Sequence, residues 1–253
     1  GGSGVVIIRY AIPSPVGYWR NDGGVSYGWA DLSGNSNTGT VYGSPDSLLF
    51  KQGINGSTST STGRDNQGFP LKFKNVGAVG FNGSNNYVGL GSDVTFKASG
   101  GWTVESWVMP DAASAGPYNI IGSTAYDYNS WFWSLFSNKL AMWDLSPGGV
   151  WKYGNTSLLV GQWYHTVLVS DPDNTSYYIY LNGEDDMSAA WAAYNGSWQP
   201  SKAGLKVRYI GRGNSAAGRY WNGQLSGAKF YDRALTQAEI QQNYKSFKNR
   251  FGK

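Results

Sequence analysis

The side chains that could do acid–base or nucleophilic chemistry are few in this sequence, and their spacing limits what they can do. Glu184, Asp185 and Asp186 stand together after an Asn-Gly pair, Glu105 lies within the segment WTVESWVMP, and His165 is the sole histidine. A retaining glycosidase needs two carboxyl groups roughly 5–5.5 Å apart, and a nucleophilic hydrolase usually needs a histidine base. The first question is therefore whether these groups can meet.

These groups are not spaced for cooperation. Because successive residues of a strand point to opposite faces, we interpret residues 184–186 as a solvated hairpin tip. The same alternation places Glu105 beside Thr103 and Trp107, not beside a second carboxylate. No Ser or Cys elbow motif accompanies His165, and the sequence has no cysteine. We expect a packed strand histidine and a protein that is not an enzyme.

A set of oxygen donors could bind a hard cation. The segment DLSGNSN places Asp31, Ser33, Asn35 and Asn37 at alternate positions. Such ligands suit Ca²⁺, although one charged ligand predicts weak binding. The same residue types also form Asx turns that bond to their own backbone. The sequence leaves a calcium site and an Asx turn both open, and it predicts no other cofactor.

Aromatic residues are abundant, with 12 Trp, 18 Tyr and 10 Phe, and several fall in segments that we expect to be loops. Flat rings beside Asn, Asp and Gln suit the apolar faces and hydroxyl groups of sugars. The same rings could form a protein contact or pack in the core. The candidate ligand-binding residues are Tyr126, Tyr128, Trp131, Trp151, Trp191, Tyr194 and Trp198.

The elements that must position these residues are mostly strands. Short segments alternate between apolar and polar residues and are separated by Gly, Asn, Asp and Ser, as is typical of a β-sandwich. Asn182-Gly183 predicts a tight hairpin, and residues 131–143 predict a second one with SNK at its tip. Further strands are expected at 78–83, 87–91, 102–110, 163–170, 206–213 and 224–232.

The pattern changes to a helix near the C-terminus. Thr236 and Glu239 have the spacing of a capping box, so Glu239 already has a structural role. Leu235 and Ile240 are spaced as a hydrophobic staple. In the helix QAEIQQNYKSFK, Ile240, Tyr244 and Phe247 share one face that can dock on the sandwich.

Composition narrows the class of protein. Charged residues are 14% of the chain and the net charge is +4. No aromatic stacking surface is expected to interleave with the modest basic cluster Lys245, Lys248, Arg250 and Lys253, so we expect a solvated end and no nucleic-acid partner. No apolar run reaches the ~18 residues of a membrane span, and the start lacks the pattern of a signal peptide, so no membrane insertion is expected.

Five segments together resemble laminin-G-like, concanavalin A-like jelly rolls of the pentraxin-like branch, as found in phage tail-fibre and virion proteins. They are residues 30–43, 79–91, 101–110, 161–184 and 209–244. The resemblance implies an all-β, two-sheet antiparallel jelly-roll sandwich with one short C-terminal helix, and its family often binds Ca²⁺. Laminarinase-type enzymes share this jelly roll, but their motif E-x-D-x-x-E is absent here.

The start GGSGVVIIRY also resembles the end of glycine-rich segments of phage tail proteins. We therefore expect residues 1–15 to be the end of such a segment and a linker, 16–247 a jelly roll with an insertion at 44–77, and 248–253 a basic tail. The resemblance implies a recognition or adhesion module at a virion or extracellular surface, with trimers favoured by analogy. Its partner would be a cell-surface or capsular glycan.

Two other functions remain open. The first is a purely structural virion or cell-surface protein whose loops contact neighbouring subunits. The second, which the scattered carboxylates disfavour, is a glycan hydrolase or lyase.

Overall fold

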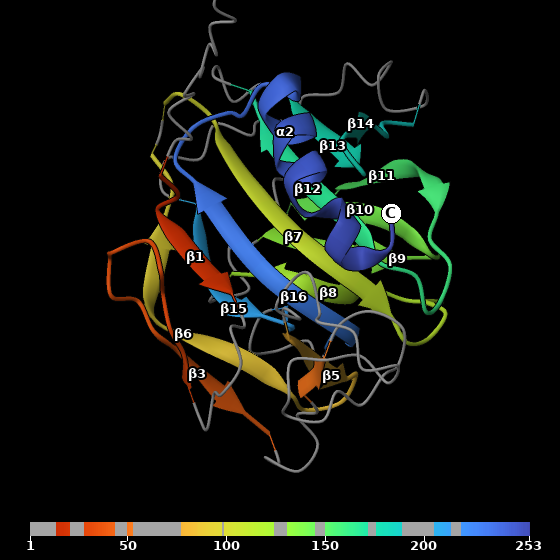
Figure 1. Ribbon diagram of the computed structural model, residues 1–253, viewed down its shortest axis with the longest axis horizontal. Coiled ribbons are helices and arrows are strands. Elements are labelled where there is room, and N and C mark those ends of the chain that lie inside the picture. The colour runs from red at the N-terminus through yellow and green to blue at the C-terminus, as the bar shows by residue number, and fades with distance from the viewer. Residues whose placement is uncertain are drawn as a thin grey trace, which may run out of the picture.

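Two antiparallel sheets pack face to face in the computed structural model, and a helix covers one of them (Figure 1). The structure describes residues 14–20, 28–43, 50–52, 77–97, 99–123, 131–144, 150–171, 176–188, 205–213 and 219–253. This architecture confirms the predicted all-β sandwich with one C-terminal helix. No helix among these residues is long and apolar enough to cross a membrane.

The sheets have eight strands each in the described part of the chain. Sheet A has the order β14 (Glu184–Asp185), β13 (Tyr177–Leu181), β12 (Tyr164–Ser170), β7 (Trp102–Pro110), β16 (Asn222–Tyr231), β5 (Gly77–Asn82) and β4 (Phe50–Gln52), and β1 (Gly17–Arg20) pairs with β16. Sheet B has the order β11 (Val150–Ser157), β10 (Lys139–Asp144), β9 (Trp131–Phe136), β8 (Tyr118–Gly122), β15 (Lys206–Ile210), β6 (Tyr87–Thr95), β3 (Gly39–Tyr42) and β2 (Gly28–Trp29).

The core lies between the inner faces of the two sheets. Trp102, Val104 and Val108 of β7 alternate with outward residues and are buried there. Trp102 reaches across the sandwich, because its ring centroid lies 5.2 Å from that of Trp131 in β9. The alternation that predicts strands at 102–110 and 131–143 therefore also defines which residues face the core.

Both predicted hairpins are present. Asn182 and Gly183 have φ values of 53° and 86°, and Ser137 and Asn138 have φ values of 50° and 61°. Two-residue turns with positive φ at both positions match the right-handed twist of paired strands. These turns connect β13 to β14 and β9 to β10, so each fixes the register of its hairpin.

Helix α2 (Gln237–Phe247) lies across the outer face of sheet A (Figure 1). It begins with the predicted capping box, in which Thr236 and Glu239 each bond to the backbone N–H of the other. Leu235 and Ile240 are buried in one apolar cluster with residues of sheet A, as the staple predicts. The helix therefore covers the face of sheet A that does not form the central core.

The last residues pack on sheet A in part, whereas Lys245 and Lys253 of the basic cluster are exposed, as expected of a solvated end. Lys248–Phe251 forms a 3-10 helix, η2, and Phe251 is buried between Trp107 and Trp163. Aromatic rings do lie beside the basic side chains, because the guanidinium carbon of Arg250 lies 5.1 Å from the ring centroid of Phe247. The sequence pattern missed this because the contacts depend on η2.

Much of the proposed domain division falls outside the described residues. Residues 1–13 and most of the 44–77 insertion are among the segments that the structure does not describe. Within the insertion, β4 pairs with β5, so part of it belongs to sheet A.

Candidate functional site

The outer face of sheet B carries aromatic side chains from several strands. In β9, Trp131, Trp133 and Leu135 are buried between the sheets. The intervening residues, Phe132 and Phe136, therefore point to the other side of the sheet. Both faces of this strand are aromatic, which indicates that the outer face has a role besides contact with water.

A first group, which we call the tryptophan cluster, extends across β9, β10 and β11. It consists of Phe132, Phe136, Trp143, Trp151 and Tyr153. The ring of Trp143 lies 5.9 Å from Phe132 and 5.0 Å from Trp151, measured between centroids, and Phe136 lies 5.0 Å from Trp151. Trp143, Trp151 and Tyr153 are partly exposed. The pairing of Trp143 with both Phe132 and Trp151 produces this ladder.

A second group, the tyrosine cluster, lies over β3, β6 and β15 and consists of Tyr42, Tyr87, Tyr209 and Tyr220. Tyr42 and Tyr87 are register partners whose rings stack at 4.7 Å. Tyr209 meets Tyr87 edge-on at 5.6 Å. Tyr42 is 45% exposed, so solvent or a ligand can reach its ring.

A glycine makes room for this cluster. Gly89 of β6 stands between strands β3 and β15 in the sheet register. A Cβ atom at this position would lie 2.8 Å from the ring of Tyr42. The missing side chain therefore allows the Tyr42 ring to lie flat on the sheet.

Two arginines stand over the two clusters. The guanidinium carbon of Arg212 lies 4.6 Å from the ring centroid of Tyr87, and that of Arg219 lies 5.1 Å from the centroid of Trp143. Their segments are hydrogen-bonded, because the N–H of Gly213 donates to the carbonyl of Arg219 at 3.0 Å. This hydrogen bond between the two segments thus places one arginine at each cluster.

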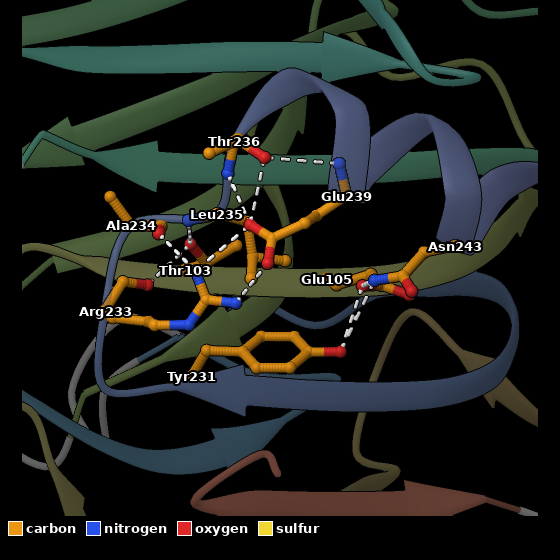
Figure 2. A network of polar contacts seen from close by, with 9 residues as sticks. All are labelled: Thr103, Glu105, Tyr231, Arg233, Ala234, Leu235, Thr236, Glu239 and Asn243. Carbon is orange, nitrogen blue, oxygen red and sulfur yellow. Dashed lines mark hydrogen bonds and ion pairs between the residues drawn. The ribbon is translucent and has the colours of Figure 1, made fainter. Parts of the chain in front are cut away.

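The outer face of sheet A is different, because its buried carboxylate, Glu105, is paired with polar groups of the same face and of α2. Glu105 is buried and accepts a hydrogen bond from Lys229 at 3.0 Å. Figure 2 shows its contact with Asn243 of α2, which donates to the same carboxylate at 2.7 Å. The hydroxyl of Tyr231 donates to the same carboxylate at 3.4 Å. Nε2 of His165 lies 3.3 Å from Glu105, without the alignment of a hydrogen bond.

The pKa of Glu105 reports this environment. Burial raises the pKa, but the charge of Lys229 and the adjacent His165 lower it more, to about 2. Glu105 is therefore an ionised acceptor at neutral pH and not a proton donor. A cavity of about 30 Å³ beside Glu105 and Lys229, enclosed in part by Phe247 and Phe251, has room for a few water molecules at most.

The other acidic residues do not supply a partner carboxylate. Glu184 and Asp185 are exposed after the Asn182-Gly183 turn, as expected. Asp186 departs from the expectation, because it is buried and accepts hydrogen bonds from the N–H and hydroxyl of Thr156. Burial raises its pKa, with smaller opposing contributions from Thr156. No group of three or more Asp, Glu or His side chains gathers among the described residues.

The proposed calcium ligands form a hydrogen-bonded turn. Asp31 accepts N–H bonds from Tyr18, Ser33 and Asn37. The side chain of Asn37 exchanges two hydrogen bonds with the backbone of Ser92. The amide of Asn35 donates to the carbonyl of Val16 at 2.8 Å. These bonds are those of the Asx turn, and with one carboxylate the described residues fit a calcium ion poorly.

The sequence placed two of the candidate ligand-binding residues wrongly. Trp131 lies in β9, not in a loop; it is fully buried, and its Nε1 donates to the carbonyl of Lys206 at 3.1 Å. Trp151 lies in β11 and belongs to the tryptophan cluster. The remaining candidates, Tyr126, Tyr128, Trp191, Tyr194 and Trp198, lie outside the described residues.

Sequence reasoning missed most of the aromatic face. Trp143 and Phe136 belong to the predicted hairpin of residues 131–143 and are not among the candidate ligand-binding residues. The sequence does contain an indication of this face. Aromatic residues stand at both odd and even positions of the strand, so both of its faces carry rings, and one buried face would not require this. The tyrosine cluster had no comparable signal, since its members come from separate strands.

Comparison of the sequence with protein-family profiles assigns the chain to a family. The family profile of the concanavalin A-like lectin/glucanases superfamily matches residues 82–241. The chain therefore belongs to this superfamily. No curated protein matches the chain by sequence. The match agrees with the resemblance to concanavalin A-like jelly rolls and does not extend to a pentraxin-like or phage branch.

Solved structures show the same fold at low sequence identity. Domain 4 of AbnA, a GH43 extracellular arabinanase from Geobacillus stearothermophilus solved in complex with arabinotriose, has 17% identity and a TM-score of 0.59, with 90% of this chain and 97% of that chain covered. The binding domain of Paraclostridial Mosquitocidal Protein 1 has 14% identity and a TM-score of 0.65, covering 95% and 55%. The receptor binding domain of a botulinum neurotoxin C/D mosaic serotype has 12% identity and a TM-score of 0.58, covering 92% and 51%.

Proposed function

We propose that the chain is a non-catalytic recognition domain that binds glycans through the outer face of sheet B. The observation that carries this proposal is the pair of aromatic clusters on one face. Partly exposed rings of Trp143, Trp151 and Tyr42 can pack against the apolar faces of sugar rings. Phenol and guanidinium groups beside them can bond to sugar hydroxyls.

Similar structures support the proposal without deciding it. The arabinanase domain was solved with arabinotriose, so a domain of this fold can hold a saccharide. The two toxin domains are named as a binding domain and a receptor binding domain, and this chain spans about half of each. At these identities the likeness concerns the fold, and the ligand must be determined for this chain.

A glycan array followed by calorimetry tests the proposal. Trp143→Ala and Trp151→Ala remove rings of the tryptophan cluster, and each is expected to weaken binding of a hit about tenfold or more. Tyr178→Ala is the matched control, because Tyr178 is an exposed aromatic residue of β13 in the other sheet. A fully folded chain that binds no glycan, or hits that respond equally to all three variants, would contradict the proposal.

The absence of catalysis is part of the proposal, because the superfamily also includes glucanases. Its support is that the buried carboxylate, Glu105, is surrounded by Lys229, Asn243 and Tyr231 and not by a second carboxylate. The test is turnover of β-glucans and alginates by the purified chain. Activity that disappears in Glu105→Gln, Glu184→Gln or His165→Ala would overturn it.

The proposed setting is a cell-exterior or virion surface. Its support is the sequence resemblance of residues 1–10 to phage tail segments, and those residues lie outside the described part of the chain. The expected result is that the chain binds purified bacterial capsular polysaccharides and does not bind animal glycans. Retention of animal glycans alone would argue against a phage role.

A structural role is the second candidate function. Leu159 and Val160 are exposed at 66% and 49% in the turn between β11 and β12, where neighbouring apolar residues suit a subunit contact. Light scattering after size exclusion tests this candidate. A stable multimer that Leu159→Ser dissociates, together with silence on the glycan array, would favour it over recognition.

A further inference from the structure

We propose that the outer face of sheet B selects acidic saccharides, with Arg219 and Arg212 as the residues that bind the carboxylate group. This inference rests on the proposed function and names the class of glycan. It follows from how the two cations are held and from which charges surround them.

Arg219 is held over a ring, and none of the carboxylates that the structure describes forms an ion pair with it. Its guanidinium carbon lies 5.1 Å from the centroid of Trp143, and the side chain is partly exposed. Its Nη1 is enclosed by protein and has no hydrogen-bond acceptor among the described residues. A buried donor without an acceptor costs free energy unless a ligand or water satisfies it. An acceptor that a ligand offered beside Trp143 would therefore be bound favourably by Arg219.

Arg212 also lies over aromatic rings, those of the tyrosine cluster. Its guanidinium carbon lies 4.6, 5.2 and 5.4 Å from the ring centroids of Tyr87, Tyr209 and Tyr220. The burial of Tyr87 raises the pKa of its phenol, although Arg212 opposes this. Tyr87 is therefore neutral at physiological pH, and this ring attracts the guanidinium without cancelling its charge.

Four other cations of the described residues are paired with carboxylates. Lys206 and Arg208 both lie within 4 Å of Asp93, Arg233 pairs with Glu239, and Lys229 pairs with Glu105. Each of these cations has a carboxylate of this chain as its partner. Within the described ranges no carboxylate forms such a pair with Arg219. The aromatic face thus carries positive charge that an anionic ligand could match.

The chemistry of the guanidinium defines the ligand. A guanidinium that stacks on a ring keeps its in-plane N–H groups, and these fit the two oxygens of a carboxylate. The hydrogen-bonded ladder that joins Gly213 to Arg219, together with the bridge between Arg212 and Tyr220, places one cation at each cluster. A saccharide with carboxylates and an apolar ring face, such as a uronic acid polymer, would satisfy both features.

Paired ligands test this selectivity. The probes are polygalacturonate, alginate, hyaluronate and polysialic acid, each beside its carboxyl-reduced form, with affinity measured by calorimetry at physiological ionic strength. The acidic form of at least one pair is expected to bind about tenfold or more tightly than its reduced form. Arg219→Gln should remove most of this difference. Arg219→Lys, which keeps the charge but not the fork of donors, should remove part of it.

Lys245→Gln is the control for net charge, because Lys245 is exposed on α2 over the other sheet. It should leave the preference unchanged, and a thermal melt of each variant verifies folding. Equal binding of acidic and reduced forms would overturn this inference and leave glycan binding intact. An equal effect of Arg219→Gln and Lys245→Gln would also overturn it. Binding of no glycan at all would refute the proposed function and this inference with it.

Discussion

The outer faces of both sheets carry aromatic and charged residues, but a helix covers only the outer face of sheet A among the described residues. The face of sheet A carries Glu105, Trp107 and Lys229, and helix α2 with η2 covers them. The face of sheet B carries Trp143 and Tyr42, and no helix among the described residues lies over it. The first face pairs Glu105 with Lys229 and Asn243, whereas the second holds rings and guanidinium groups partly open to solvent.

The difference separates a stabilising surface from a surface free for binding. Buried polar groups are tolerated when every member has a partner, as Glu105 does. Exposed aromatic rings contribute less to folding, because water still reaches part of their surface. Variants on sheet A should therefore change mainly stability, and variants on sheet B should change mainly binding.

Glu105→Ala should have the largest effect on stability. It leaves Lys229 and the amide of Asn243 without their shared acceptor beneath α2. Removing one partner of a buried ion pair costs about 3–5 kcal/mol. Urea unfolding of the wild type and the variant measures the loss. A change below about 1 kcal/mol would show that the helix does not depend on this carboxylate.

Acidification should weaken the contact of the Glu105 carboxylate with Lys229 and Asn243. Because the folded pKa of Glu105 is about 2 and its ordinary value is 4.5, the stabilisation is complete above pH 4.5 and is lost as the pH falls towards 2. The difference between these pKa values corresponds to about 3 kcal/mol. Glu239, whose pKa is also lowered to about 2, mainly by Arg233, titrates in this window.

The contribution of Glu105 can be separated by a variant. The acid-induced loss of stability should be smaller in Glu105→Gln than in the wild type, because the amide does not ionise. Melting temperatures between pH 7 and pH 2.5 measure it. Parallel pH profiles in the two proteins would assign the acid sensitivity to other groups.

Phe251→Ala should have an intermediate effect. The Phe251 ring stacks on Trp107 at 4.0 Å and meets Trp163 at 4.8 Å. It lies at the edge of the sandwich, so we expect a loss of about 2 kcal/mol, below the usual range for a fully enclosed phenylalanine. Chemical denaturation measures it. If the denaturation midpoint does not change, the packing of η2 on sheet A does not stabilise the fold.

Tyr42→Ala should have little effect on stability, although it removes a whole ring from sheet B. Because Tyr42 is 45% exposed, the expected loss of stability is below about 1 kcal/mol. The same variant should weaken binding of any glycan that contacts the tyrosine cluster. A destabilisation as large as that of Glu105→Ala would erase the distinction between the two faces.

The fold could be predicted further than the site, for a physical reason. Alternation and turn chemistry are local, so residues 102–110, Asn182-Gly183 and the Thr236 capping box indicate their structures directly. The structural role of His165 also follows from its place in an apolar strand, and it is fully buried.

The aromatic face depends on contacts between distant strands. Tyr42 and Tyr87 stand 45 positions apart in sequence and become neighbours through the β3–β6 register. The segment around Trp151 contains glycines and reads as a loop, yet β11 forms because β10 offers an edge to pair with. Phe251 similarly packs because Trp107 and Trp163 meet beneath it. None of these pairings is encoded within a short window.

The smallest expected effect concerns calcium at the seam between the sheets. Asp31 bridges the two sheets, because it pairs with Trp19 of β1 and precedes β3. Its oxygens already accept three backbone N–H groups, and these bonds contribute to its lowered pKa against the opposing effect of burial. A cation would have to compete for oxygens that hold the turn together. The melting temperature should therefore be the same in EDTA and in millimolar calcium, whereas Asp31→Ala should lower it. A ligand that binds the folded state raises stability as its concentration rises. A melting temperature that rises with calcium and not with magnesium would therefore contradict this prediction and show that Asp31 belongs to a calcium site.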